Sequence, residues 1–354
     1  MEKWEEYVRK VVPYTPGEQP KDTDIIKLNT NENPYPPCNG VKRLLREYDY
    51  GELKLYPDPN SAELVNVLAN SLNVSSENIF VGVGSDDVIS MAFLTFFGSG
   101  KPILFPDITY SFYDVWADVY KIPYKTKQLD NDFKIKNEDY YEENGGIIFP
   151  NPNAPTGVYK ELSEIEDIIA ANKDSIVIID EAYIDFGGKS CVPLTEKYDN
   201  LLVIRTFSKS SSMAGARIGY AVGNKKLIKY LNDVKFSINS YTMNRLSQKC
   251  GVEAVLDKEY FEKTVEKIVS TRENAKARLK ELGFSFPDSY ANFIFAAHQS
   301  VSAEVIFEEL KKRKIFVRYW NKPRINNHLR ITIGTDEEME KLFIALSDIL
   351  SERG

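Results

Sequence analysis

The chain has 354 residues, of which 43% are hydrophobic, and this length is enough for one large domain and a smaller one. Its 45 Lys and Arg against 52 Asp and Glu leave a net charge of −7, so neither nucleic acid nor an anionic membrane is expected as its main partner. The opening sequence MEKWEEYVRK lacks the apolar core of a signal peptide, and no apolar run approaches the roughly 20 residues that span a bilayer.

The cysteines and histidines are few and scattered. We interpret Cys38, Cys191 and Cys250 as free thiols of a protein in the reducing cytoplasm. With only His298 and His328, and without paired cysteines, we expect no metal site.

Predicted strands and helices alternate over the first 220 residues. An N-terminal arm is predicted for residues 1–24, because PYTP favours an extended chain. Helices are predicted at 61–73 with Ser61 as the N-cap, at a segment opening at Ser85, at 110–120 and at 162–172. Strands are predicted at 79–84, 102–107, 145–150, 175–183 and 202–204. This alternation predicts an α/β fold with a mainly parallel sheet and helices on both faces.

The pattern changes after about residue 240. Charged helices are predicted at 258–282, 302–313 and 336–351, and they alternate with the apolar runs FIFAAH, IFVRYW and LRITIG. We therefore predict a large domain at 25–240 and a smaller α+β domain at 241–354.

Polar residues follow several of the predicted strands directly. They are Gly84-Ser85-Asp86, Tyr110, the NPNAPTG loop at 151–157, Asp180 with Tyr183, and Ser208-Lys209. Each alone has an ordinary structural explanation, such as a helix cap, a turn or a solvated surface lysine. Because the carboxyl ends of parallel strands meet at one edge of a sheet, their joint occurrence predicts a ligand site there.

These residue types suit one particular cofactor. A buried lysine amine can form a Schiff base with an aldehyde, and a carboxylate can keep a pyridine nitrogen protonated. Arginine, hydroxyl groups and a helix N-terminus bind phosphate, and a flat aromatic side chain stacks on a heterocycle. Pyridoxal 5′-phosphate combines an aldehyde, a pyridine ring and a phosphate.

The motifs resemble the fold-type I aminotransferases, and among them the histidinol-phosphate aminotransferase family. The resemblance covers nearly the whole chain, in LNTNENPYP (28–36), YPD (56–58), GVGSDD (82–87), PNAPTG (152–157), DEAYIDF (180–186), RTFSKSSSMAGARIGY (205–220) and LRITIGT (329–335). It implies a fold-type I large domain, pyridoxal 5′-phosphate as cofactor, and transamination of L-histidinol phosphate with 2-oxoglutarate in histidine biosynthesis.

The resemblance also implies individual roles. Lys209 is expected to form the Schiff base, Asp180 to pair with the pyridine nitrogen, and Tyr183 to hydrogen-bond the ring oxygen. Tyr110 is expected to stack on the ring. The groups implied for the cofactor phosphate are Ser208, Arg217 and the backbone at Ser85 and Asp86.

Further implied residues lie outside these strand ends. Tyr56 is expected to reach the cofactor phosphate from the other subunit of a homodimer, so that the active site is shared. Tyr14, Arg318 and Arg330 match positions that hold the substrate's own phosphate. The NENP segment and the polar stretch at 239–244 are candidates for contacting the imidazole.

One position departs from the family pattern. Where the family usually has an asparagine directly before Pro-Thr-Gly, in contact with the ring oxygen, this chain has Ala154, and Asn153 stands one residue earlier. Either Asn153 takes over this contact or Tyr183 makes it alone.

Three alternatives remain at this stage. A transaminase for aromatic amino acids shares every cofactor residue, and a phosphothreonine decarboxylase combines a similar fold with a phosphorylated substrate. A transcriptional regulator that reuses this fold is disfavoured by the acidic net charge and by the short segment before the core.

Overall fold

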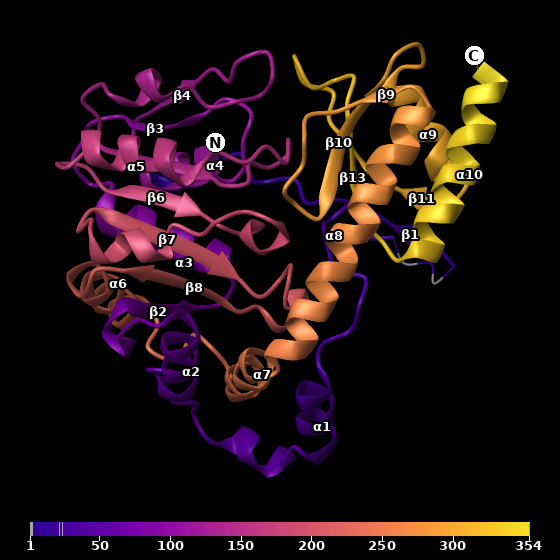
Figure 1. Cartoon of the computed structure of the whole chain (residues 1–354). Helices are drawn as coiled ribbons and strands as arrows, with labels where there is room; N and C mark the ends of the chain where they lie inside the picture. The colour runs from indigo at the N-terminus through magenta and orange to yellow at the C-terminus, as the bar shows by residue number, and fades with distance from the viewer. Residues whose placement is uncertain (1–2, 21, 23, 354) are drawn as a thin grey trace.

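The computed structural model describes residues 3–20, 22 and 24–353, and a seven-stranded sheet forms the centre of the large domain (Figure 1). The strand order is β2-β8-β7-β6-β5-β3-β4. The strands are β2 (Ile79–Gly82), β3 (Ile103–Pro106), β4 (Tyr124–Lys127), β5 (Gly146–Pro150), β6 (Val177–Asp180), β7 (Leu201–Thr206) and β8 (Gly219–Gly223). Both antiparallel pairings involve β8, so the prediction of a mainly parallel sheet is confirmed.

Helices cover both faces of this sheet. Successive residues of a strand point to opposite faces, and in β6 Val177 and Ile179 join one apolar core whereas Ile178 joins the other. The helices of the first core are α1 (Asn39–Glu47), α2 (Ala62–Leu72), α5 (Leu162–Ala171) and α7 (Arg245–Leu256). Those of the second are α3 (Ser85–Phe96), α4 (Tyr113–Tyr120) and α6 (Lys225–Ile238).

The C-terminal part contains a smaller antiparallel sheet with its own apolar core, as expected for an α+β domain. The strands, in spatial order, are β12 (Arg318–Tyr319), β13 (Leu329–Thr332), β10 (Phe293–His298) and β9 (Phe284–Ser285). The helices that pack on this core are α8 (Lys258–Glu281), α9 (Ala303–Lys312) and α10 (Asp336–Arg353). A separate parallel pair joins β1 (Ile26–Lys27) to β11 (Ile315–Phe316).

The predicted domain boundaries stay a prediction, and two contacts cross them. Strand β1 pairs with β11 of the smaller domain, although residue 26 was assigned to the large domain. Helix α7 packs against α1 and α2, although it follows residue 240. Each part of the chain therefore contributes an element that packs on the other part.

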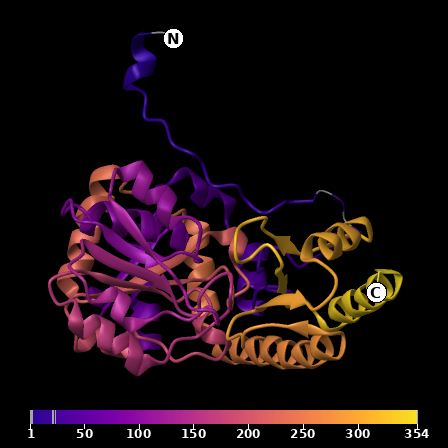
Figure 2. The same ribbon diagram turned by 90° about the horizontal axis from the view of Figure 1, so that it is seen from above.

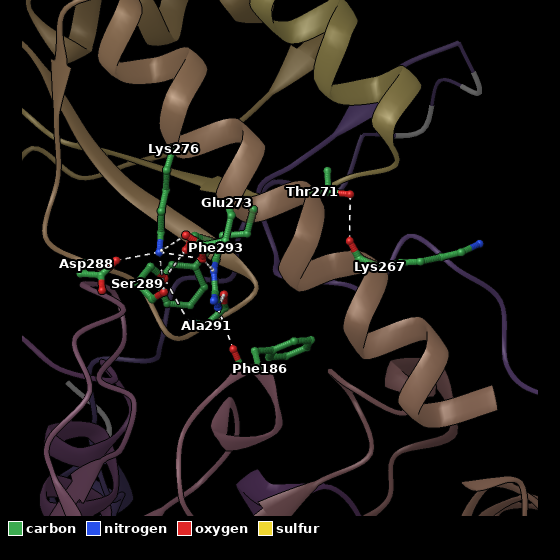
Figure 3. A network of polar contacts seen from close by, with 10 residues as sticks. Phe186, Lys267, Thr271, Glu273, Lys276, Asp288, Ser289, Ala291 and Phe293 are labelled. Atoms are coloured by element: carbon green, nitrogen blue, oxygen red, sulfur yellow. Dashed lines mark hydrogen bonds and ion pairs between the residues drawn. The ribbon is translucent and has the colours of Figure 1, made fainter. Parts of the chain in front are cut away.

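A buried cation ties α8 to both domains. Arg272 is 5% exposed, and its Nη1 donates to the carbonyl oxygens of Phe186 at 2.8 Å and Ala291 at 3.0 Å. One turn later, Lys276 forms an ion pair of 2.7 Å with Asp288 (Figure 3). Since Phe186 belongs to the large domain and Ala291 precedes β10, these contacts hold the two sheets in a defined relation.

The N-terminal segment leaves the body of the molecule, as Figure 2 shows. It contains a short 3-10 helix at Lys3–Tyr7, followed by chain without regular structure. Tyr14 returns to the body and stacks on Phe112, with 4.1 Å between ring centroids. The arm thus delivers one aromatic side chain to the large domain.

Three local details differ from the predictions. Ser61 precedes α2 but gives no side-chain cap, because Asp58 accepts the hydrogen bond from the Ala62 amide instead, at 2.7 Å. The run 315–320 forms two short strands with different partners rather than one. Edge strand Tyr124–Lys127 was not predicted, since its mostly exposed sequence YKTK has no apolar pattern.

Candidate active site

Two adjoining cavities lie at the carboxyl ends of the large sheet, with volumes of about 750 and 160 Å³. The last residues of β3, β5, β6 and β7 line one or the other. The residues that line both are Thr30, Asp86, Tyr110, Ala154, Tyr183, Lys209 and Arg217. The larger volume falls within the range of about 300–1,000 Å³ that is usual for small-molecule sites.

Lys209 lies where the two cavities meet. Lys209 follows β7, whose apolar residues are buried in the middle of the sheet. The side chain of Lys209 is only partly exposed. Its Nζ donates to the carbonyl oxygen of Thr30 at 3.1 Å and lies 5.8 Å from the centre of the Tyr183 ring. Within the described part of the chain, no carboxylate lies within ion-pair distance of this amine, and acids nearby pair with Arg205 and Arg217 instead. The Lys209 side chain therefore has no acidic partner, and it lines both cavities.

Asp180 is a buried carboxylate that lines the smaller cavity. It is 4% exposed, accepts a hydrogen bond from the Tyr113 hydroxyl at 3.0 Å, and accepts another from the Ala182 amide at 3.2 Å. Burial raises the pKa of Asp180 to about 6, and the two hydrogen bonds oppose this rise. A cation beside this carboxylate would offset its desolvation.

An anion site lies at the N-terminus of α3. The N-cap Gly84 has a φ of +85° and supplies no side-chain cap to the amides of the first turn. A Cβ added to Gly219 would lie 2.3 Å from the backbone of Gly84 and Ser85, so only glycine lets β8 approach this turn. Arg217 lines both cavities beside it, and its Nη2 pairs with Asp86 at 3.0 Å. Open amides and a guanidinium together favour a phosphate.

Two tyrosines face the same space from different loops. The Tyr110 hydroxyl donates to Asp86 at 2.7 Å, and burial followed by the charge of Asp86 raises the pKa of Tyr110 well above its usual value. The Tyr183 hydroxyl accepts a hydrogen bond from Nδ2 of Asn31 at 2.9 Å. Both phenols are thus held in fixed orientations, and the raised pKa of Tyr110 keeps its hydroxyl protonated at neutral pH.

Two arginines that line the larger cavity stand directly opposite each other on neighbouring strands. Arg318 in β12 pairs in register with Arg330 in β13, and both guanidinium groups lie within 5.2 Å of the Trp320 ring centre. Like charges in this arrangement repel. Burial, and also the charge of Arg318, lowers the pKa of Arg330. Among the described residues neither arginine has a carboxylate partner, and Nε of Arg330 has no hydrogen-bond partner.

The structure brings most of the sequence-predicted residues together. The residues that line at least one of the cavities are Tyr14, Ser85, Asp86, Tyr110, Asp180, Tyr183, Ser208, Lys209, Arg217, Arg318 and Arg330.

Two predicted residues do not line these cavities. Tyr56 is 77% exposed and stacks on Tyr241 with 4.6 Å between ring centroids. Asn153 is 3% exposed, and its Nδ2 donates to Thr156 and to the carbonyl oxygen of Ile108, both at 3.0 Å. Both protons of its amide nitrogen are therefore already engaged inside the protein.

Sequence reasoning missed the residues that orient the predicted ones. Tyr113 donates to Asp180, but in the sequence it is one aromatic residue among several in a helical pattern. Asn31 and Asn33 contact Tyr183 and the backbone of Lys209, respectively, at 2.9 and 3.1 Å. The only available signal was the NENP motif, which was noted without a role for its individual side chains.

The donor set fits pyridoxal 5′-phosphate. The two cavities are lined by a lysine without an acidic partner, a buried carboxylate, a tyrosine ring, and an uncapped helix N-terminus with an arginine beside it. Each matches a different chemical group of this cofactor. No cluster of three or more potential metal ligands occurs among the residues that the structure describes.

Comparison with known proteins agrees with this geometry. The model of the family "Aminotransferase class I and II" matches residues 23–346. Histidinol-phosphate aminotransferases from Lactococcus lactis subsp. cremoris and Clostridium beijerinckii are 49% and 51% identical to this chain. They cover 99% and 98% of it, and the matches span 98% and 97% of those proteins.

A solved structure has the same fold. The histidinol-phosphate aminotransferase from Sinorhizobium meliloti, in complex with pyridoxal-5′-phosphate, superimposes with a TM-score of 0.86 at 23% identity, over 93% of this chain and 92% of that one. The protein is therefore a pyridoxal 5′-phosphate-dependent enzyme of the aminotransferase class I and II family, and within it the chain belongs to the histidinol-phosphate aminotransferase family.

Proposed function

We propose that the protein transfers the amino group of L-histidinol phosphate to 2-oxoglutarate, as a step of histidine biosynthesis. The observation that carries the substrate class is the opposed pair Arg318 and Arg330, which lines the same cavity as Lys209 but comes from β12 and β13 and not from the phosphate site at α3. A cofactor phosphate accounts for one cationic end of the cavity. The other end calls for a second anion, which the phosphate of the amino substrate supplies.

The cofactor end is assigned to residues of the large domain. We assign Lys209 to the covalent bond with the cofactor, Asp180 to the pyridine nitrogen, Tyr183 to the ring oxygen and Tyr110 to the ring face. The groups assigned to the cofactor phosphate are Ser208, Arg217 and the backbone of Ser85 and Asp86. In support, Asp180 is a buried acid whose pKa is raised to about 6 by burial and which a pyridinium would stabilise as a carboxylate.

The proton transfers are assigned to Lys209. When bound, the cofactor supplies the carbonyl group that takes up the amine and the ring that withdraws electrons from the substrate's α-carbon. Once freed by the substrate amine, the Lys209 amine would take the substrate's α-proton as a general base and would then donate it as a general acid. Its only polar partner among the described residues is the Thr30 carbonyl, which leaves the nitrogen lone pair usable once the amine is neutral.

The substrate end is assigned to Tyr14, Arg318 and Arg330. Arginine binds phosphate and carboxylate with the same planar fork of donors, so one pair can hold histidinol phosphate in one half-reaction and the glutamate side chain in the other. Tyr14 reaches this end from the arm, stacked on Phe112. Within the NENP segment, Nδ2 of Asn31 donates to Tyr183, and Nδ2 of Asn33 donates to the carbonyl oxygens of Lys209 and Ser210.

A half-reaction tests the proposal. The cofactor-loaded protein is mixed with histidinol phosphate alone, and conversion of the cofactor to its amine form is followed by absorbance. We expect rapid conversion with histidinol phosphate, slow conversion with histidinol or an aromatic amino acid, and no carbon dioxide from phosphothreonine. Faster conversion with the aromatic amino acid than with histidinol phosphate would refute the substrate assignment.

We further propose that the enzyme is a cytoplasmic homodimer. Exposed apolar side chains gather on the segment before α2 and on the end of α6, including Tyr50, Leu53, Leu55, Tyr56 and Ile238. Such a patch is typical of a surface that a second copy covers. Among the described residues no helix combines the length and apolarity needed to cross a membrane.

A further inference from the structure

Asn31 is held in one orientation by the smaller domain. It is 1% exposed and has a φ of +57°, a conformation that asparagine tolerates better than most residues. Its backbone N–H donates to Oγ1 of Thr332, and its carbonyl oxygen accepts from Nδ2 of Asn292, both at 3.0 Å. Backbone and neighbours therefore leave its side chain little freedom.

The side chain of Asn31 links this anchor to Tyr183. Because Thr332 already accepts from the Asn31 backbone, its hydroxyl proton is available for Oδ1 of Asn31, 3.0 Å away. This directs Nδ2 of Asn31 to the Tyr183 oxygen at 2.9 Å. A tyrosine hydroxyl has one proton, and with a donor already on its oxygen that proton is left for another acceptor. Tyr183 lines both cavities, so the acceptor is a ligand in the site.

Neither asparagine side chain of the NPNAPTG loop lines the two cavities. Ala154 lines both cavities but has no polar side-chain atom. Nδ2 of Asn151 donates to the Lys160 carbonyl, and Nδ2 of Asn153 donates to Thr156 and to the Ile108 carbonyl. The hydrogen bond to the ring oxygen therefore depends on Tyr183 and on whatever orients it.

We propose that Asn31 is a positioning residue that directs the Tyr183 hydroxyl proton to the ring oxygen of the cofactor, and so compensates for the alanine at position 154. The inference rests on the proposed contact between Tyr183 and the cofactor. It assigns to the NENP segment a function in tuning the cofactor, exerted through Tyr183.

The test is a pH titration of the visible absorbance of the cofactor-loaded protein without any amino substrate. The nitrogen that joins Lys209 to the cofactor shares its proton with the ring oxygen, so loss of that proton leaves more negative charge on the oxygen. A hydrogen bond from Tyr183 stabilises this charge and lowers the midpoint of the titration. Any change that withdraws the Tyr183 proton should raise the midpoint.

Asn31→Asp is the informative variant, because aspartate has the same size, tolerates a positive φ and accepts the Tyr183 proton instead of donating to its oxygen. We expect the midpoint to rise by about one pH unit. Thr332→Val, which removes the hydroxyl group that holds the side-chain amide of Asn31, should raise the midpoint by less. Asn172→Asp, a change at another buried asparagine bonded to Tyr140 and Ile168, is the matched control and should leave it unchanged.

Double variants decide the route of the effect. In a Tyr183→Phe background, Asn31→Asp and Thr332→Val should cause no further shift, and Ala154→Asn should bring the midpoint of Asn31→Asp back toward the wild-type value. If Tyr183→Phe shifts the midpoint but both other variants leave it unchanged, or if the shifts add in the double variants, the inference is wrong. If Tyr183→Phe itself has no effect, the proposed Tyr183 contact fails instead. Thr332→Val carries the test should Asn31→Asp fail to retain cofactor.

Discussion

The two ends of the active-site cavity are built in different ways. At the cofactor end, Asp180 and Lys209 follow neighbouring strands of one sheet, and Asp180 is held by two hydrogen bonds. At the substrate end, Tyr14, Arg318 and Arg330 come from the arm and two strands of the smaller domain, and the two arginines repel each other without an acid partner among the described residues. At the first end the side chain of Asp180 is already held in place without a ligand, whereas at the second end two positive charges lie close together without an acid that balances them. Substitutions at the first end should abolish the reaction with every substrate. Substitutions at the second end should change only which substrate is preferred.

Lys209→Ala should have the largest effect. The variant loses the covalent bond to the cofactor and the proton carrier together, so turnover should fall by about a thousandfold or more. Lys322→Ala, at another lysine lining the larger cavity, is the control and should keep most of the activity. Turnover of Lys209→Ala above about a tenth of wild type, a loss below roughly 1.4 kcal/mol, would rule out the assignment.

Asp180→Asn keeps the shape of the side chain but removes its charge. Turnover per bound cofactor should fall by about a hundredfold or more, because the ring nitrogen is no longer kept protonated. Cofactor affinity, measured by equilibrium dialysis, should change less. The reverse result, lost affinity with normal turnover per bound cofactor, would make Asp180 an anchor without an electronic role.

Substitutions of Arg318 or Arg330 should weaken the preference of the enzyme for histidinol phosphate over histidinol. A charge-assisted hydrogen bond contributes about 1.5–3 kcal/mol, so Arg318→Ala or Arg330→Ala should lower kcat/KM for histidinol phosphate by roughly 10- to 150-fold. The slow reaction with histidinol should scarcely change, since histidinol lacks the phosphate. The measured quantity is the ratio of kcat/KM for the two amines. An unchanged ratio in both variants would place the substrate phosphate elsewhere.

Tyr56 tests whether the cofactor end is complete within one chain. Tyr56→Phe should lower activity at limiting cofactor, and mixing it with Lys209→Ala should restore activity, because each mixed dimer then has one intact site. Random mixing should recover about a quarter of wild-type activity, since half of the dimers are mixed and each has one intact site. Mixed dimers that form without any recovery would show that Tyr56 acts in its own subunit.

The smallest expected effect concerns the stability of the cofactor-free protein. Burial raises the pKa of Asp180 from 3.8 to about 6, so the folded state holds this proton more tightly than the unfolded state. Its contribution to stability is full below pH 3.8 and is lost as the pH rises through about 6. Asp180→Asn should therefore raise the free energy of unfolding at pH 8, by up to about 3 kcal/mol, and leave it nearly unchanged at pH 4.

Urea unfolding at both pH values measures this difference. Glu181, whose pKa burial raises to about 7, keeps its own pH dependence in both proteins and does not affect the comparison. An equal effect of Asp180→Asn at pH 4 and pH 8 would mean that the charge of the carboxylate is not what destabilises the cofactor-free site.

The cofactor end could be predicted from the sequence for a local reason. Asp180 and Lys209 each follow an apolar run, and adjacent parallel strands bring their carboxyl ends to one edge of the sheet whatever the details of packing. The spacing from Lys209 to Arg217 lies within one strand-turn-strand segment, so chain connectivity keeps the two residues close. The small-domain arginines were named by family resemblance, since an arginine within a short apolar run has no distinctive pattern of its own.

Contacts between remote segments were decided only by the tertiary structure. The opposition of Arg318 and Arg330 depends on a strand register that splits IFVRYW after Phe316. The links from Tyr113 to Asp180 and from Asn31 to Tyr183 join side chains that are 67 and 152 residues apart. Sequence periodicity specifies which face of an element is buried but not which side chain of another element meets it. The sequence by itself thus determined the fold class and the residues that we propose for the chemistry, and packing between remote segments decided which side chains orient them.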